Sequence, residues 1–203
     1  ATPVLVDIDP ENWTIEPYRA SFCVTEKTKV IIGVDIFGHP CDWRMALWFN
    51  QTGEPISYIE DAAQAHGSKY KADNGWFYCG NGGIASTFSM FANKAITSGE
   101  GGVILTDDHE LAERISLIRN HGMKANYEHE LVGGNHRLNN LSAALGTAQM
   151  ERWDYLIAER ERVARTYDTH LPEELGRRPV SSWAQPATWR TRSSGRWLTR
   201  SGD

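Results

Sequence analysis

The chain is predicted to be an α/β protein built on a mostly parallel sheet. Short apolar runs have the length of buried strands, and they lie at 29–34, 56–59, 84–90 and 103–105. Segments with helical spacing separate or follow them, at 43–54, 107–121 and 138–171. This alternation favours right-handed βαβ units, in which neighbouring strands are parallel. The 203 residues are enough for one domain with its own core.

The first half of the chain opens on a predicted strand. Residues 3–8 alternate apolar and polar side chains, and the polar, proline-containing stretch 9–12 predicts a turn, so 1–20 are expected to form a strand and then a turn. A second strand at 29–34 leads into a loop that contains His39 and Pro40. The helix at 43–54 is expected to stop at Thr52-Gly53.

Two polar residues follow strands at positions where open α/β sheets bind ligands. Asp61 follows the buried run 56–59 and has two interpretations: it caps a short helix that begins at Ala62, or it contacts a cofactor. Gln64 lies three residues on and would share its helical face. Lys94 follows the strand 84–90, and a lysine there is either a surface residue or, if burial keeps it neutral, able to form a Schiff base.

The segments around these residues are predicted to be turns and loops. The stretch 68–83 is a polar, glycine-rich loop; the family resemblance given below implies a short hairpin within it, with 76–78 as the packed face. Gly99, Gly101 and Gly102 permit a tight backbone before the strand 103–105. Asp107 and Glu110 resemble a capping box for the helix 107–121, with Gly122 as its C-cap. Residues 123–137 are predicted to be a loop, and 138–171 one or two long helices.

Composition excludes several classes of protein. The net charge is −5, and the residues after Leu175 carry six arginines and one aspartate, so the rest of the chain carries −10. Such an acidic body argues against nucleic-acid binding. No apolar run reaches membrane-spanning length and no signal peptide is visible. Three cysteines, Cys23, Cys41 and Cys79, lack metal-ligand spacing, which predicts no metal site and fits free thiols in a cytoplasmic protein.

The tail at 176–203 has no helical or strand period and is rich in Arg, Ser and Trp. Our hypothesis is that it is read out of frame and is disordered or foreign to the fold. The alternative is a basic tail that binds an anionic partner.

Five motifs, in order, resemble one known family. They are PVLVDIDPENWTIEP (3–17), IEDAAQAHG (59–67), FSMFANK (88–94), TSGEGG (97–102) and GGNHRLNNLSAALGTAQMERWD (133–154). Over roughly 3–172 the chain resembles the DegT/DnrJ/EryC1/StrS family of pyridoxal-phosphate (PLP) sugar aminotransferases. The resemblance implies the large-domain core of a fold-type-I PLP transferase, truncated at both ends. Residues 1–137 would be the PLP-binding core, 138–175 an interdomain helix region and 176–203 the aberrant tail.

The resemblance also implies a role for each site residue. Lys94 would form the Schiff base with PLP. Asp61 would keep the ring nitrogen protonated, because a carboxylate stabilises its charged form. By the same resemblance Gln64 contacts the phenolic oxygen, Ser89 donates to the phosphate, and Asn135 reaches the cofactor phosphate of a neighbouring subunit in a homodimer. Arg137 is the second candidate for that last role.

The activity implied is amino transfer from an amino acid, expected to be glutamate, to a nucleotide-linked keto-sugar. Some family members are dehydratases with histidine in place of the lysine, so Lys94 favours a transaminase. The motif around Lys94 is most similar to the perosamine-synthase-like members. The alternative is a catalytically inactive fragment that acts at most as a binding or interaction module. Which sugar is aminated, and at which position, cannot be predicted from the sequence.

Overall fold

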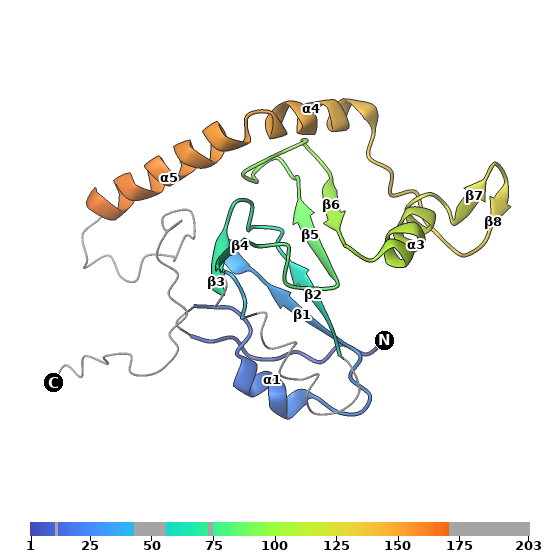
Figure 1. Ribbon diagram of the computed structural model, residues 1–203, viewed down its shortest axis with the longest axis horizontal. Coiled ribbons are helices and arrows are strands. Elements are labelled where there is room, and N and C mark those ends of the chain that lie inside the picture. The colour runs from blue at the N-terminus through green and yellow to red at the C-terminus, as the bar shows by residue number, and fades with distance from the viewer. Residues whose placement is uncertain (11, 43–55, 73–74, 171–203) are drawn as a thin grey trace.

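A four-stranded sheet lies at the centre of the protein (Figure 1). The computed structural model describes residues 1–10, 12–42, 56–72 and 75–170, so the predicted helix 43–54 and the tail 176–203 lie outside the described residues. The strand order is β1-β2-β5-β6. The bounds are β1 Val30–Val34, β2 Ser57–Asp61, β5 Ala85–Ser89 and β6 Gly102–Leu105. The β1–β2 and β2–β5 pairs are parallel and β5–β6 is antiparallel, which confirms a mostly parallel sheet.

The register brings the ends of three strands to one edge of the sheet. Val34 pairs with Asp61, and Asp61 pairs with Thr87 on β5. The antiparallel strand β6 starts at this same edge, where Gly102 pairs with Ser89. Asp61 and Ser89, the last residues of β2 and β5, therefore lie at the carboxyl ends of neighbouring parallel strands, where sheets of this kind bind ligands.

Two small apolar clusters hold this sheet. The first joins the helix α1 (Pro17–Cys23) to the sheet through Ala20, Ile31, Ile56 and Tyr58. The second lies beneath the turn after β2 and consists of Ala62, Ala65, Tyr70 and Cys79, with Phe77 and Phe88 packed against them. Its aromatic members come partly from the hairpin β3 (Lys69–Ala72) and β4 (Gly75–Tyr78), which confirms the hairpin predicted within 68–83. The prediction that 76–78 form its packed face was wrong in part, because Phe77 packs but Trp76 and Tyr78 are exposed.

The amino-terminal prediction was wrong in two respects. Residues 3–8 do not form a strand: Ile8 makes one isolated bridge to Ile15, and Leu5 is 92% exposed. The alternating pattern was present, but no strand in the described part of the chain pairs with it. The predicted turn region also contains the start of the helix α1, which begins at Pro17. Its N-cap Glu16 accepts hydrogen bonds from the N–H groups of Tyr18 and Arg19.

The helix α3 (His109–Arg119) is confirmed, but its caps differ from the prediction: the N-cap is one residue later, and the C-cap is Asn120. Asp108, not Asp107, is the N-cap, and its carboxylate accepts the N–H of Leu111 at 3.0 Å. At the other end His121 is left-handed with φ 60°, and the N–H of Gly122 donates to the Leu117 carbonyl at 2.7 Å. Gly122 is left-handed as well, with φ 70°, and its N–H makes the longer of the two hydrogen bonds of a Schellman motif, whereas the N–H of His121 donates to the Gly134 carbonyl.

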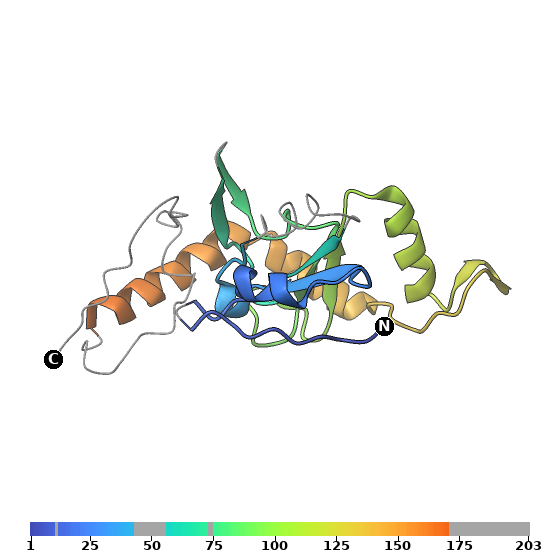
Figure 2. The same ribbon diagram turned by 90° about the horizontal axis from the view of Figure 1, so that it is seen from below.

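Beyond α3 the predicted loop 123–137 contains a small hairpin, β7 (Met123–Ala125) and β8 (Glu128–His129). The helices α4 (Asn140–Met150) and α5 (Trp153–His170) follow, as predicted, and run across the carboxyl edge of the sheet (Figure 1). Figure 2, seen from below, shows α3 and the β7–β8 hairpin extending away from the sheet on one side. Within the described residues, none of the helices has the length and apolar character needed to cross a membrane.

Candidate active site

Asp61 ends β2 with its carboxylate already oriented. Its Oδ1 atom accepts hydrogen bonds from the Ala63 N–H at 3.1 Å and the Thr87 hydroxyl at 3.3 Å. The chain then makes turns rather than the short helix considered for Asp61. Ala62 and Ala65 anchor these turns, since they are 0% and 1% exposed. Among the described residues, Oδ2 of Asp61 makes no hydrogen bond, so one carboxylate oxygen is available to a ligand.

Gln64 belongs to the same turns, so it does not share a helical face with Asp61 as expected. Its Oε1 atom accepts the Phe37 N–H at 2.7 Å. Phe37 lies in the 3-10 turn η1 (Ile36–Gly38) and has φ 54°, a left-handed conformation that is rare for a residue with a side chain. The hydrogen bond ties the segment after β1 to the turn after β2, and it leaves the amide NH2 of Gln64 as the donor.

Ser89 and Lys94 come from the end of β5 and the turn that follows. The Ser89 Oγ atom accepts the Phe91 N–H at 3.3 Å, and its own O–H is a donor. The Lys94 N–H donates to the Phe91 carbonyl at 3.0 Å, and the next two residues, Ala95 and Ile96, are 4% and 1% exposed. Lys94 itself is half-buried. Within the described residues its Nζ atom makes no hydrogen bond or ion pair.

The helices α4 and α5 pack against this part of the chain. Arg160 of α5 donates from Nη2 to the Lys94 carbonyl at 3.0 Å. A Cβ added at Gly67 would lie 2.9 Å from the Cδ1 atom of Ile157 on α5, and one added at Gly146 of α4 would lie 2.9 Å from the Met90 Cε atom. Glycine therefore permits the close approach of the helix pair to the turn after β2 and to the Lys94 loop.

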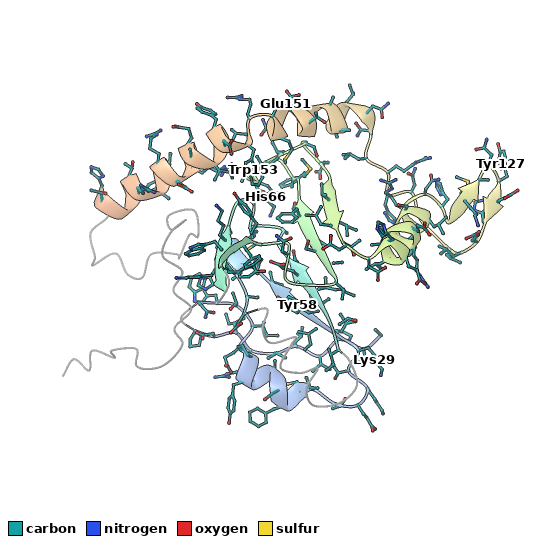
Figure 3. The ribbon with its side chains drawn as sticks, viewed as in Figure 1. Lys29, Tyr58, His66, Tyr127, Glu151 and Trp153 are labelled. Carbon is teal, nitrogen blue, oxygen red and sulfur yellow. The ribbon has the colours of Figure 1, made fainter. Side chains whose placement is uncertain are left out.

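His66 belongs to the motif at 59–67, but the sequence analysis predicted no catalytic role for it. It is 4% exposed, and neither ring nitrogen has a hydrogen-bond partner in the described part of the chain. Figure 3 shows it just below the junction of α4 and α5, near Trp153. Burial lowers the pKa of His66 to about 4, and the nearby charges of Lys94 and Arg160 act in the same direction.

Asn135 does not join the other four predicted site residues. It forms an isolated bridge with Asn120 at the end of α3, and its Oδ1 atom accepts from Arg137 Nε at 3.2 Å. Arg137 also donates from Nη1 to Asn120 Oδ1 at 3.2 Å. The structure therefore gathers Asp61, Gln64, Ser89 and Lys94 at the carboxyl edge of the sheet. Asn135 and Arg137 lie beside α3, on the side that extends away from the sheet.

A second buried polar cluster escaped the sequence analysis. Asp35, Glu60 and Cys79 each offer an atom within 4.8 Å of the others. Glu60 accepts from the N–H groups of Gly80 and Gly82, both at 2.8 Å, and so fixes the turn after β4. Burial, and then the charge of Glu60, raise the pKa of Asp35 to about 8. The three residues are far apart in sequence, and the signal was an acidic residue directly after each of the apolar runs 29–34 and 56–59.

Comparison with known proteins decides the family. The family model described as the DegT/DnrJ/EryC1/StrS aminotransferase family matches residues 1–193. The chain belongs to this family. A DegT-family relative from Caulobacter vibrioides, GDP-perosamine synthase, is 41% identical over 180 residues, which are 88% of this chain and 47% of the relative. The chain thus spans about half the length of the curated relatives it matches.

Solved structures of the family agree with the fold. DesV from S. venezuelae, solved in complex with a ketimine intermediate, matches with a TM-score of 0.77 at 31% identity. The matched region is 85% of this chain and 45% of the DesV chain. A putative sugar aminotransferase from Streptococcus pneumoniae in its PLP form has a TM-score of 0.73 at 27% identity, covering 83% of this chain and 48% of its own. These likenesses confirm the predicted large-domain core of a PLP-dependent transferase.

The residues gathered at the carboxyl edge fit PLP. The cofactor offers an aldehyde, a protonatable ring nitrogen and a phosphate, which call for an amine, a carboxylate and hydrogen-bond donors. The chain presents Lys94 Nζ and Asp61 Oδ2 without partners among the described residues, and the Ser89 hydroxyl beside them at the end of β5. The unpartnered ring nitrogens of His66 are a further sign that this edge is built around a polar ligand.

Proposed function

We propose that the chain is the cofactor-binding part of a PLP-dependent aminotransferase that moves an amino group from an amino acid to a nucleotide-linked keto-sugar. The observation that carries the proposal is the meeting of Asp61, Gln64, Ser89 and Lys94 at the ends of β2 and β5. Membership of the DegT family and the likeness to a GDP-perosamine synthase support the substrate class. Glutamate is the amino donor we expect.

Asp61 and Gln64 would orient the cofactor ring. Bound PLP supplies an electron sink that stabilises negative charge beside the reacting amine carbon. The free Oδ2 oxygen of Asp61 would hold the ring nitrogen in its protonated form, because a carboxylate stabilises the cation. The Gln64 NH2 group, left free by the hydrogen bond from Phe37 to Oε1, would donate to the phenolic oxygen. The Ser89 hydroxyl would donate to the phosphate.

Lys94 would have two tasks. Its amine would hold the cofactor aldehyde, and its half-buried position beside the buried Ala95 and Ile96 would limit competition from water. Once an incoming amine had freed it, the Lys94 amine would carry a proton from the α-carbon of the amino donor to the C4′ carbon of the cofactor, and would make the reverse transfer in the second half of the reaction, a general acid–base role. The hydrogen bond from Arg160 to its carbonyl keeps the backbone in place during both steps.

We further propose a homodimer. Asn135, with Arg137 as the second candidate, lies on the segment beside α3 that extends from the sheet, which supports contact with the cofactor phosphate of a neighbouring subunit (Figure 2). The relatives named GDP-perosamine synthase favour a perosamine-synthase-like sugar aminotransferase. The three cysteines of the chain are free thiols, and two of them are buried, which supports a location in the reducing cytoplasm.

The first half-reaction tests this proposal. The full chain is loaded with PLP, freed of excess cofactor and mixed with glutamate, and the 2-oxoglutarate formed is measured per bound cofactor. We expect about one equivalent from the wild type and from Lys124→Ala, which alters an exposed lysine paired with Glu130, and none from Lys94→Ala. If wild-type protein with PLP bound at Lys94 forms no keto acid from glutamate or from other amino acids, the proposed activity is wrong.

A further inference from the structure

Two aromatic residues that contact each other have backbone conformations that are rare for residues with side chains. Trp13 has φ 65° and Phe37 has φ 54°, so both lie in the left-handed region. Their rings pack edge-on, with centroids 5.5 Å apart and planes at 68°. A bulky residue in this region is strained, and such strain persists where the surrounding structure enforces it, commonly at a functional site.

Phe37 lies directly beside two of the proposed cofactor residues. It follows the end of β1 at Val34, which pairs with Asp61. The Asp35 N–H donates to the Asp61 carbonyl at 2.9 Å. The Phe37 N–H donates to Gln64 Oε1 at 2.7 Å. The strained backbone of Phe37 is therefore held by the same hydrogen bond that fixes the Gln64 side chain, at the edge of the sheet where ligands bind.

A closed turn of the amino-terminal segment presents Trp13 to Phe37. The Trp13 N–H donates to the Asp9 carbonyl at 2.8 Å, and the Asp9 N–H donates to the Thr14 carbonyl at 2.9 Å. Thr14 anchors the turn, since it is 3% exposed, and both its N–H and its hydroxyl donate to Asn12 Oδ1. These contacts hold the Trp13 backbone in its left-handed conformation.

Both rings stay partly open to solvent in spite of this support. Trp13 is 41% exposed and Phe37 is 42% exposed, so the strain is not offset by full burial of the rings. Tyr18 and Phe22 on α1 form another exposed edge-on pair, with centroids 4.9 Å apart, but they lie in an ordinary helix. Strain therefore distinguishes the aromatic pair that lies beside the cofactor residues.

The chemistry of this pair matches one part of the proposed substrate. The face of an aromatic ring is negative and attracts C–H groups, so it can pack against the apolar face of a sugar ring. The keto carbon of the substrate has to reach the cofactor, which brings the sugar ring to the edge where Gln64 lies. Aromatic walls with a few polar groups are typical of small-molecule sites.

We propose that Trp13 and Phe37 form the wall against which the sugar ring of the nucleotide-linked substrate packs. The rings exclude water from one face of the sugar and orient its keto carbon toward the cofactor. A sugar with C–H groups on that face is favoured, because a hydroxyl group placed there would lose water without gaining a hydrogen bond. This inference rests on the proposed function, since the ligand is the substrate proposed there.

Equilibrium binding of two nucleotides to the full chain tests the contact. GDP-mannose carries a sugar ring and GDP does not, and both are measured with the wild type, Trp13→Gly, Phe37→Gly and Trp13→Phe. Glycine adopts a left-handed backbone without strain, so each glycine variant removes a ring and leaves its turn intact. We expect the affinity for GDP-mannose to fall about fivefold in the glycine variants, as for loss of one aromatic contact, at constant affinity for GDP. Trp13→Phe should retain most of the wild-type affinity.

Phe22→Ala is the matched control, since it removes a ring from the exposed pair on α1, and it should leave both affinities unchanged. The proposal is overturned if the wild type does not bind GDP-mannose, or if Trp13→Gly binds it as tightly as the wild type does. An equal loss of affinity for GDP and GDP-mannose would also overturn it, because the rings would then contact the nucleotide rather than the sugar.

Capture of PLP on Lys94, measured in the same proteins, separates this contact from the proposed function. If PLP is captured on Lys94 but GDP-mannose binding does not depend on Trp13, the sugar contact is wrong and the proposed function stands. If GDP-mannose binding depends on Trp13 but no protein captures PLP on Lys94, the sugar contact stands and the proposed function fails.

Discussion

Replacing Asp35 with asparagine should remove a large part of the pH dependence of stability. Asp35 is 1% exposed, its Oδ1 atom accepts the Cys41 N–H at 2.8 Å, and its Oδ2 atom is buried without a partner among the described residues. Glu60 lies beside it with both oxygens already accepting N–H groups. The simplest arrangement that satisfies these groups has a proton on Asp35 that is donated to Glu60.

The sign and size of the effect follow from the raised pKa. Folding raises the pKa of Asp35 from 3.8 to about 8, first through burial and then through the charge of Glu60. The folded protein thus keeps a proton that the unfolded chain releases, and the stabilisation is complete below about pH 4 and is lost as pH rises through about 8. Between about pH 6 and about pH 8 the loss amounts to about 2 kcal/mol.

Urea unfolding followed by circular dichroism over this pH range is the assay. Asp35→Asn keeps the size of the side chain, and its NH2 group donates to Glu60 at every pH, so the decline of unfolding free energy between about pH 6 and about pH 8 should shrink by about 2 kcal/mol. Asp107→Asn, an exposed aspartate, is the matched control and should follow the wild type. Parallel curves for wild type and Asp35→Asn would refute the shared proton.

Two further substitutions test the packing and capping found in the structure. Gly67→Ala should destabilise the protein by about 1–3 kcal/mol more than Gly99→Ala, because both glycines have φ near +80° but only at Gly67 does the new Cβ meet Ile157. Thermal unfolding of both variants measures the difference. Equal losses of stability would mean that α5 does not pack tightly against this turn. Asp108→Ala should cost about 1 kcal/mol and Asp107→Ala almost nothing, since only the former accepts a helix N–H; chemical denaturation decides, and the reverse order would restore the cap predicted from sequence.

The central strands could be predicted because their sequences carry the signal locally. β2 and β5 were predicted from the runs 56–59 and 84–90, and the structure has them as Ser57–Asp61 and Ala85–Ser89, each ending in a polar residue. The segment 3–8 has an equally clear alternation, yet it forms no strand, because a strand needs a partner and the pattern does not say whether one exists. The two-residue strand β8 at Glu128–His129 is too short to give a pattern at all.

The ends of elements depended on atoms that a pattern does not distinguish. Asp107 and Asp108 are adjacent acceptors, and the capping-box spacing favoured the first, whereas the backbone turns into the helix one residue later. At the other end the sequence pointed to Gly122, whereas the C-cap is Asn120; His121 and Gly122 are both left-handed, and Gly122 makes the closing hydrogen bond. An uncertainty of about one or two residues is inherent in reading caps from residue types.

The site was predicted in part. Asp61 and Lys94 could be found because they belong to motifs at the ends of predicted strands: Asp61 is the last residue of β2, and Lys94 lies in the loop after β5. The carboxyl ends of parallel strands meet at one edge of the sheet. The hydrogen bonds that fix the site residues could not be predicted, because they join distant segments. The Phe37 N–H fixes the Gln64 side chain, and Arg160, 66 positions away, donates to the Lys94 carbonyl. The Asp35–Glu60–Cys79 cluster was missed for the same reason. The roles of the five predicted site residues stay predictions.

Capture of PLP is the most direct test of the site as a whole. The purified chain is incubated with PLP and reduced with borohydride, and the pyridoxyl label is located by peptide mass, with Lys94→Ala as control. We expect the label on Lys94 and its absence from that peptide in the control. Label spread over surface lysines such as Lys71 and Lys124, or no label, would contradict the cofactor site and favour a catalytically inactive fragment that serves at most as a binding module.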